Sequence, residues 1–171
     1  MIINRKYRNL TMIFLCTASV FCMGSCLHSE KKSEIVREYK TAAEASEACG
    51  LAQVDFVPEG YSAAAYRTVY NYVSETEYMN GEKTAVLRIV STEYNTTNLS
   101  GFAETGLAEV YSARDGREFE LGRTRENVYT AEWQQSYGGV QCNMSFVLMN
   151  GEIGEYKIML ESLLDYLGES Q

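Results

Sequence analysis

The strongest constraint on the fold is the strict alternation of apolar and polar residues near the C-terminus. Apolar side chains occupy every second position of this run, at Val140, Cys142, Met144, Phe146 and Leu148. Because successive side chains of a strand point to opposite faces of a sheet, this period of two predicts a strand with one buried face. Such a strand requires neighbouring strands and a covering layer. The chain should therefore fold around a β-sheet.

Other segments predict the neighbouring strands. The polar stretch between Glu93 and Gly106 predicts a loop. An Arg-Asp-Gly sequence ending at Gly116 is typical of a hairpin turn between two of the strands. The predicted strands are Ala63–Val73, Thr84–Ser91, Leu107–Ala113, Arg117–Leu121, Val128–Gln135 and Val140–Leu148.

A helix is predicted at each end of these strands. Apolar residues recur at helical spacing from Ser33 to Cys49, although Thr41–Glu44 also matches a capping box, so that the helix can start there instead. Gly50 then follows as a C-terminal cap. Residues Glu152–Leu167 form an amphipathic pattern with the helical period. The expected fold class is α+β, an antiparallel meander flanked by an N-terminal and a C-terminal helix.

The N-terminus has the pattern of a secretory signal peptide. Three basic residues, Arg5, Lys6 and Arg8, precede the nearly uninterrupted apolar run Leu10–Cys22, and no acidic residue accompanies them. A membrane-spanning helix needs roughly 20 apolar residues, so this run is short for a span. We therefore expect the segment to direct export.

The end of the apolar run resembles the lipobox of bacterial lipoproteins. Met23-Gly24-Ser25-Cys26 places two small residues before a cysteine, and polar residues follow at once. The resemblance implies that Cys26 becomes the mature N-terminus and carries acyl chains such as palmitate. The alternatives are an ordinary signal peptide cut elsewhere or an uncleaved anchor helix. The expected division is a signal peptide at 1–25, a lipidated cysteine and tether at 26–38, and a single domain at 39–168.

Charge restricts the partners. The chain of 171 residues carries a formal net charge of −8, and loss of residues 1–25 removes three positive charges, which leaves about −11. An acidic surface repels phosphate backbones, so nucleic acid is not an expected partner. It also does not adhere to an anionic membrane. The lipid should therefore provide the attachment to the membrane, on its outer face or on another envelope leaflet.

Short motifs resemble a family of uncharacterised extracytoplasmic domains. They are Thr41–Ala45, Gly50, Val57-Pro-Glu-Gly-Tyr61, Ala131-Glu-Trp133, the strand Val140–Leu148, and Asn150-Gly151 before the last helix. The resemblance covers Thr41 to Leu167. Such domains occur after the transmembrane helix of anti-sigma-factor-like proteins and also in small lipoproteins. An anti-sigma role is not expected here, because a transmembrane helix and a cytoplasmic sigma-binding domain are lacking. The family supplies no catalytic residues.

The residues favour no catalytic chemistry. Nucleophilic catalysis usually needs a histidine, and the single histidine, His28, lies in the tether. Zinc sites need clustered cysteine and histidine, whereas the domain has only Cys49 and Cys142. Glu132 lies beside Trp133 but on the opposite face of its strand, so it is expected to be a solvated glutamate. We therefore predict no catalytic residues, no metal and no cofactor.

Two groups of residues can each be interpreted in two ways. Cys49 and Cys142 fall on predicted buried faces, where they either form a disulfide or remain two separate thiols. Tyr66, Tyr70 and Tyr72 are expected on one strand face. There they either bind a glycan or peptide, or pack against neighbouring strands.

The expected function is binding. We predict a membrane-anchored lipoprotein whose non-catalytic extracytoplasmic domain binds a protein, a peptide or an envelope component. One alternative is a carrier of lipid or another small apolar ligand, which needs a cavity lined by residues such as Phe119, Leu121, Trp133 and Phe146. The other is a hydrolase that uses two carboxylates.

Overall fold

The computed structural model describes residues 35–94, 96, 98–102, 106–124 and 127–169. The predicted signal peptide, Cys26 and the residues up to 34 lie outside the described residues. Within the part described, no helix is both long and apolar enough to cross a bilayer.

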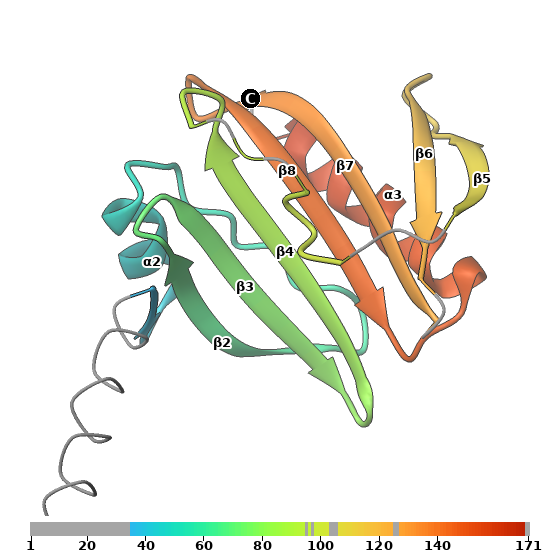
Figure 1. Ribbon diagram of the computed structural model, residues 1–171, viewed down its shortest axis with the longest axis horizontal. Coiled ribbons are helices and arrows are strands. Elements are labelled where there is room, and N and C mark those ends of the chain that lie inside the picture. Colours follow the sequence, from blue (N-terminus) through green and yellow to red (C-terminus); the bar gives the residue numbers. More distant parts are fainter. Residues whose placement is uncertain (1–34, 95, 97, 103–105, 125–126, 170–171) are drawn as a thin grey trace, which may run out of the picture. The chain divides into compact units, whose positions relative to one another are not determined.

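An eight-stranded antiparallel sheet with helices forms the domain (Figure 1). The prediction of an antiparallel sheet with helices is therefore confirmed. The strand order across the sheet is β1-β2-β3-β4-β8-β7-β6-β5. The strands are β1 (Val36–Tyr39), β2 (Ser62–Val69), β3 (Val73–Asn80), β4 (Lys83–Ser91), β5 (Leu107–Ser112), β6 (Glu118–Arg123), β7 (Val128–Tyr137) and β8 (Val140–Met149).

The sheet is not the single meander that we predicted. The strands β1 to β4 follow one another, but the chain then crosses to the far edge and returns through β5, β6 and β7 to β8. As a result β8 pairs with β4 along Thr84–Ser91. The physical reason lies in β8 itself, because Val147 and Leu148 point to opposite faces and both are fully buried. A strand that is buried on both faces belongs in the middle of a sheet.

The first helix is shorter than the longer of the two predictions. Val36–Tyr39 forms the edge strand β1 rather than a helix, so the domain begins inside the predicted tether. The helix α2 spans Ala42–Ala48, and Thr41 is its N-cap: the Glu44 N–H donates to Thr41 Oγ1 at 3.2 Å. The capping-box alternative is thus confirmed. The predicted cap Gly50 has the positive φ of +68° that favours glycine after a helix.

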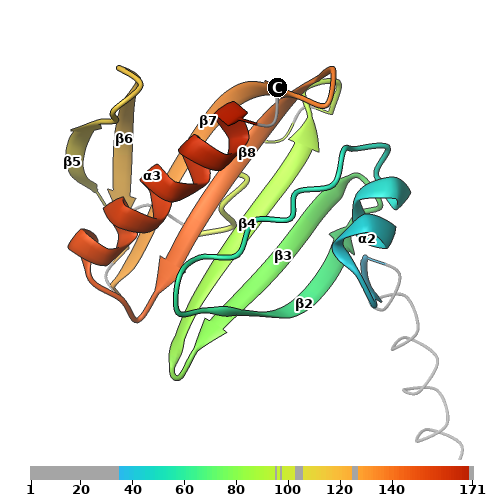
Figure 2. The same cartoon turned by 180° about the vertical axis from the view of Figure 1, so that it is seen from behind.

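The second helix covers one face of the sheet. Helix α3 (Ile153–Glu169) lies across β7 and β8, and Figure 2 shows it in front of them. Its apolar stripe packs against alternate residues of the central strands, including the fully buried Phe146. The buried Tyr156 hydroxyl donates to the Phe146 carbonyl at 2.8 Å. This face therefore contains the main hydrophobic core.

The predicted strand Ala63–Val73 contains a turn. Tyr70 and Asn71 both have positive φ, of 55° and 63°, and the Tyr72 N–H donates back to the Val69 carbonyl. This tight turn joins β2 to β3, a strand that we did not predict. Turns of this kind usually contain glycine, and the absence of glycine here hid the turn from sequence analysis. The remaining predicted strands are present.

Candidate functional site

The face of the sheet opposite α3 carries a row of polar side chains that crosses six strands. Its members are direct cross-strand partners, so they lie side by side. We call this set the polar row; from β1 to β7 it consists of Glu38, Arg67, Glu75, Arg88, Ser145 and Glu132.

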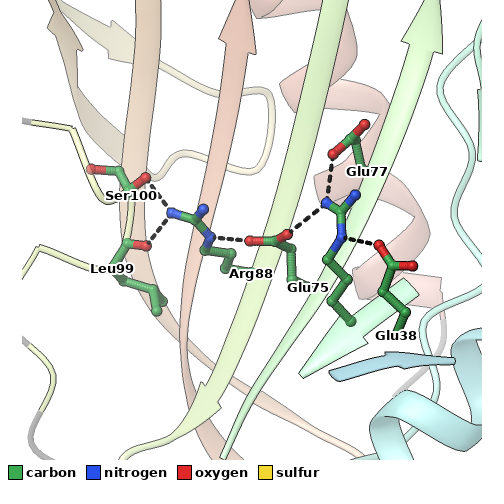
Figure 3. A network of polar contacts seen from close by, with 7 residues as sticks. Glu38, Glu75, Glu77, Arg88, Leu99 and Ser100 are labelled. Atoms are coloured by element: carbon green, nitrogen blue, oxygen red, sulfur yellow. Dashed lines mark hydrogen bonds and ion pairs between the residues drawn. The ribbon is translucent and has the colours of Figure 1, made fainter. Parts of the chain in front are cut away.

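The centre of the polar row is a buried carboxylate between two guanidinium groups (Figure 3). Glu75 accepts from Arg67 Nη1 at 3.1 Å and from Arg88 Nε at 2.8 Å, and only 8% of its side chain is exposed. Arg67 also binds Glu77 at 2.6 Å and Glu38 at 3.1 Å. The hydrogen bond to Glu77, ahead of those to Glu38 and Glu75, raises the pKa of Arg67 despite partial burial, so the guanidinium stays charged.

Two members of the polar row form hydrogen bonds with the segment that connects β4 to β5. We call residues 96 and 98–102 the crossing segment; Figure 1 shows it in front of the sheet, with α3 behind. Arg88 Nη1 donates to the carbonyl of Leu99 at 3.1 Å and to that of Ser100. The Ser100 N–H donates to Glu132 Oε1 at 2.6 Å. Arg88 thus binds two carbonyls, and Glu132 one N–H group, of the same short stretch of backbone.

Gly101 and two apolar side chains complete this attachment. A Cβ on Gly101 would lie 2.7 Å from Arg88 Nη1 and its φ is +74°, so a side chain here would displace the guanidinium in a backbone conformation that favours glycine. Leu99 packs with Val73 and Val90, while Phe102 packs with a second small cluster around Val147. The described residues of the predicted loop form no helix or strand, and the crossing segment covers one face of the sheet rather than projecting from an edge.

A cleft of about 510 Å³ lies between the β2–β3 turn and the crossing segment. The strands and the turn supply apolar and aromatic side chains together with Arg88, and the crossing segment supplies the polar Thr96 and Asn98 as well as Leu99 and Gly101. We call it the tyrosine cleft; its lining residues are Val69, Tyr70, Tyr72, Val73, Arg88, Thr96, Asn98, Leu99 and Gly101.

Three tyrosine rings are stacked at this cleft. Tyr70 and Tyr72 have ring centroids 5.8 Å apart, and Tyr72 and Tyr94 have centroids 4.6 Å apart with planes only 9° from parallel. Tyr70 is 55% exposed, so part of its side chain is available to a ligand. The turn, rather than a shared strand face, brings Tyr70 and Tyr72 together.

The predicted group of three tyrosines is not the group that the structure forms. Tyr66 is opposite Thr76 and points to the other face of the sheet from its neighbour Arg67, which belongs to the polar row. Tyr94 takes its place in the stack, although it follows β4 and lies far from the turn in sequence. Spacing along the chain contains no signal for that contact.

A smaller cleft of about 220 Å³ adjoins the tyrosine cleft and shares Thr96 and Leu99 with it. Glu132, Gln134 and Asn143 also line this smaller cleft. Thr96 Oγ1 is buried and has no hydrogen-bond partner among the described residues. A buried hydroxyl normally has a partner, so this one has an unused capacity for a hydrogen bond at the edge of both clefts.

The arrangement is suited to binding. The carboxylate of Glu75 is held by two guanidinium groups, and Glu132 already accepts from a backbone N–H, so neither has the surroundings of a general acid. Glu132 is exposed, as predicted, but it also has this structural contact. In the described part of the chain, no group of three histidine, cysteine or acidic residues is placed to hold a metal ion.

The two cysteines are free thiols in the structure. Cys49 is the C-cap of α2 and Cys142 lies buried on β8. Of the two interpretations of this pair, the structure contains the separate thiols and not the disulfide. Burial raises the pKa of Cys49 to about 11, and burial also raises the pKa of Cys142.

Comparisons of the chain with protein-family models, with curated proteins and with solved structures found no match. The site is therefore defined by its own geometry.

The buried pair in the polar row leads to a stability prediction. Glu75→Gln keeps the size of the side chain but leaves Arg88 without the carboxylate that neutralises it, and breaking a buried ion pair costs about 3–5 kcal/mol. Glu38→Gln is the control, because Glu38 is 72% exposed and its loss should cost less than about 1 kcal/mol. Urea denaturation measures both free energies of unfolding. Equal effects would show that Glu75 has no special role.

The thiols give a prediction for alkylation. At pH 8 a pKa of about 11 leaves Cys49 with roughly a hundredfold less thiolate than an ordinary cysteine, so it should react that much more slowly with iodoacetamide. The thiolate, and with it the rate, should rise as the pH increases toward 11. After unfolding without a reductant, peptide mapping should find both cysteines alkylated. A disulfide-linked peptide containing Cys49 and Cys142 would contradict the structure.

Proposed function

We propose that this protein is a bacterial lipoprotein whose extracytoplasmic domain binds a component of the cell envelope in the tyrosine cleft. In this proposal the chain is exported, residues 1–25 are removed, and acyl chains on Cys26 hold the protein on the outer face of the membrane. The proposal includes the resemblance of its motifs to the uncharacterised extracytoplasmic family; of the fold which that resemblance implies, an antiparallel sheet with helices is present. It binds its ligand without catalysing a reaction.

The observation that carries the proposal is the conformation of Tyr70. Its φ of 55° lies in the left-handed region, which a bulky side chain adopts at a cost of about 1–2 kcal/mol. In return the turn presents a large, half-exposed ring beside a cleft, stacked on Tyr72. Strain that places an exposed aromatic side chain at a cleft supports a binding role, because packing alone does not require it.

The tether supports a role close to the membrane. The residues between Cys26 and β1 can extend over at most about 30 Å. This length keeps the domain near the membrane surface in which the acyl chains are inserted. The acidic mature chain has no electrostatic attraction to anionic lipid. The domain is therefore expected to face the layer outside the membrane rather than lie flat on the lipid.

The two alternative functions have less support. A carrier needs an empty apolar cavity, but Phe119, Leu121 and Phe146 are buried in the core that packs against α3. Trp133 packs against Phe119 edge to face, with ring centroids 5.9 Å apart. A hydrolase needs a free pair of carboxylates, whereas Glu75 and Glu77 both bind Arg67. Binding at the surface is the function that the contacts favour.

The lipid anchor is tested by metabolic labelling with an alkyne analogue of palmitate. Wild-type protein should incorporate the label, and Cys26→Ala should abolish incorporation because only this thiol lies at the lipobox. Cys22→Ala is the matched control, since this cysteine lies in the apolar run that is removed. Incorporation that survives Cys26→Ala, or that Cys22→Ala also abolishes, would contradict lipidation of Cys26.

The binding role is tested by photocrosslinking in cells. Benzoylphenylalanine in place of Tyr70 keeps an aromatic side chain in the tyrosine cleft and should form an adduct with an envelope component that mass spectrometry identifies. The control places the same group at Val110 on β5, which is 57% exposed and lies outside the cleft. An adduct at both positions, or at neither, would count against binding in the tyrosine cleft.

A further inference from the structure

We infer that the ligand is an uncharged carbohydrate chain of at least two sugar units, lying across the tyrosine cleft and the smaller cleft. This inference rests on the proposed binding function and names the chemical class of the ligand. The two clefts adjoin each other, because Thr96 and Leu99 line both. A ligand that extends from one to the other therefore passes over the crossing segment.

The first argument is the shape of the aromatic surface. Tyr72 is stacked against both Tyr70 and Tyr94 and is only partly exposed. Tyr70 is 55% exposed and offers aromatic surface beside Tyr72. A sugar ring has apolar C–H faces and a polar periphery, so it can pack on the face of Tyr70 and bond to neighbouring polar atoms. Tyrosine provides both kinds of contact at once.

The second argument is the kind of polar group that lines the two clefts. Asn98 Oδ1 accepts from Ser100 Oγ at 2.7 Å, which leaves the amide N–H groups of Asn98 to donate. Gln134 and Asn143 in the smaller cleft have amides that both donate and accept, and Thr96 has a buried hydroxyl with no partner among the described residues. Sugar hydroxyls also both donate and accept. A polyol therefore matches this set better than a ligand with acceptors alone.

The third argument is charge. Arg88 is the one cation among the described residues that line the two clefts, and Glu75 neutralises it at 2.8 Å. The smaller cleft adds the carboxylate of Glu132, and the whole chain is acidic. A phosphate or a polyanion would be repelled, and its charge would find no free cation. An uncharged ligand has no such penalty.

The position of the clefts disfavours an extended peptide. Extended peptides gain affinity by adding a strand to an open sheet edge. The strands beneath the crossing segment have no open edge, because β4 pairs with β3 and β8, and β8 pairs with β4 and β7. Recognition here depends on side chains alone. A proline-rich peptide, which docks on aromatic side chains without strand pairing, is the competing ligand for the experiment to distinguish.

The test is calorimetric titration of the full-length protein in detergent micelles. The probes are two- to six-unit oligomers of β-1,4-linked N-acetylglucosamine, β-1,4-linked glucose and α-1,4-linked glucose. At least one series should bind, with a dissociation constant between roughly 10 μM and 1 mM and tighter binding by the tetramer than by the dimer. A proline-rich decapeptide is titrated in parallel.

Variants locate the site. Tyr70→Asn removes the ring but suits the left-handed backbone, so the protein should stay folded while affinity for the tetramer falls by about tenfold or more. Gln134→Ala should weaken tetramer binding by about threefold to tenfold through the smaller cleft. Val110→Asn, which removes a comparably exposed side chain outside both clefts, should leave affinity unchanged.

Each contrary result has a separate meaning. No binding of any oligosaccharide at 10 mM, or equal losses in Tyr70→Asn and Val110→Asn, overturns the carbohydrate assignment. Binding of the proline-rich peptide that Tyr70→Asn abolishes, with no oligosaccharide bound, also overturns it but leaves the proposed binding function standing. If the photocrosslinker at Tyr70 captures nothing in cells as well, both proposals fail.

Discussion

The attachment of the crossing segment to Arg88 is the interaction on which the rest of the structure depends. Strand β8 reaches the centre of the sheet only if the chain between β4 and β5 crosses one face, and that segment has its own backbone groups to satisfy. Arg88 binds two of its carbonyls and Glu132 binds one of its N–H groups. Glu75 in turn compensates the charge of the partly buried Arg88, so the guanidinium is paired with a carboxylate while it donates to the crossing segment.

This arrangement gives the two faces of the sheet different roles. The face toward α3 is filled by apolar side chains such as Phe146 and Leu160, which provide the hydrophobic free energy of folding. The opposite face is polar at its centre and only partly covered. The tyrosine cleft forms beside the crossing segment because the segment covers Val73 and Val90 but stops short of the β2–β3 turn. The proposed binding surface is thus separated from the core, and changes to Tyr70 are expected to affect the fold little.

Sequence patterns predicted the strands and helices that form because of interactions between residues close together in the chain. The alternation at Val140–Leu148 identified β8, and the helical period identified α3, because burial on one face imposes each period. The cap at Thr41 was also identifiable, since its side chain bonds a backbone N–H three residues away. The turn at Tyr70 and Asn71 was not identifiable, because neither residue is glycine although both have the positive φ that glycine usually adopts. Strand β1 was hidden for a related reason: its pairing with β2 overrides a sequence that also has helical spacing.

The order of residues alone was sufficient for an antiparallel sheet with helices and for an acidic chain, because these depend on period and charge count. The lipoprotein signal stays a prediction from contiguous motifs at the N-terminus. The partners in the polar row required the folded chain. Glu38, Arg67, Glu75, Arg88 and Glu132 come from separate strands, and their contacts depend on strand order and register. The stack of Tyr94 on Tyr72 likewise depends on the path of the chain after β4. Contacts between distant residues follow from how the strands are ordered, and no periodicity along the chain encodes that order.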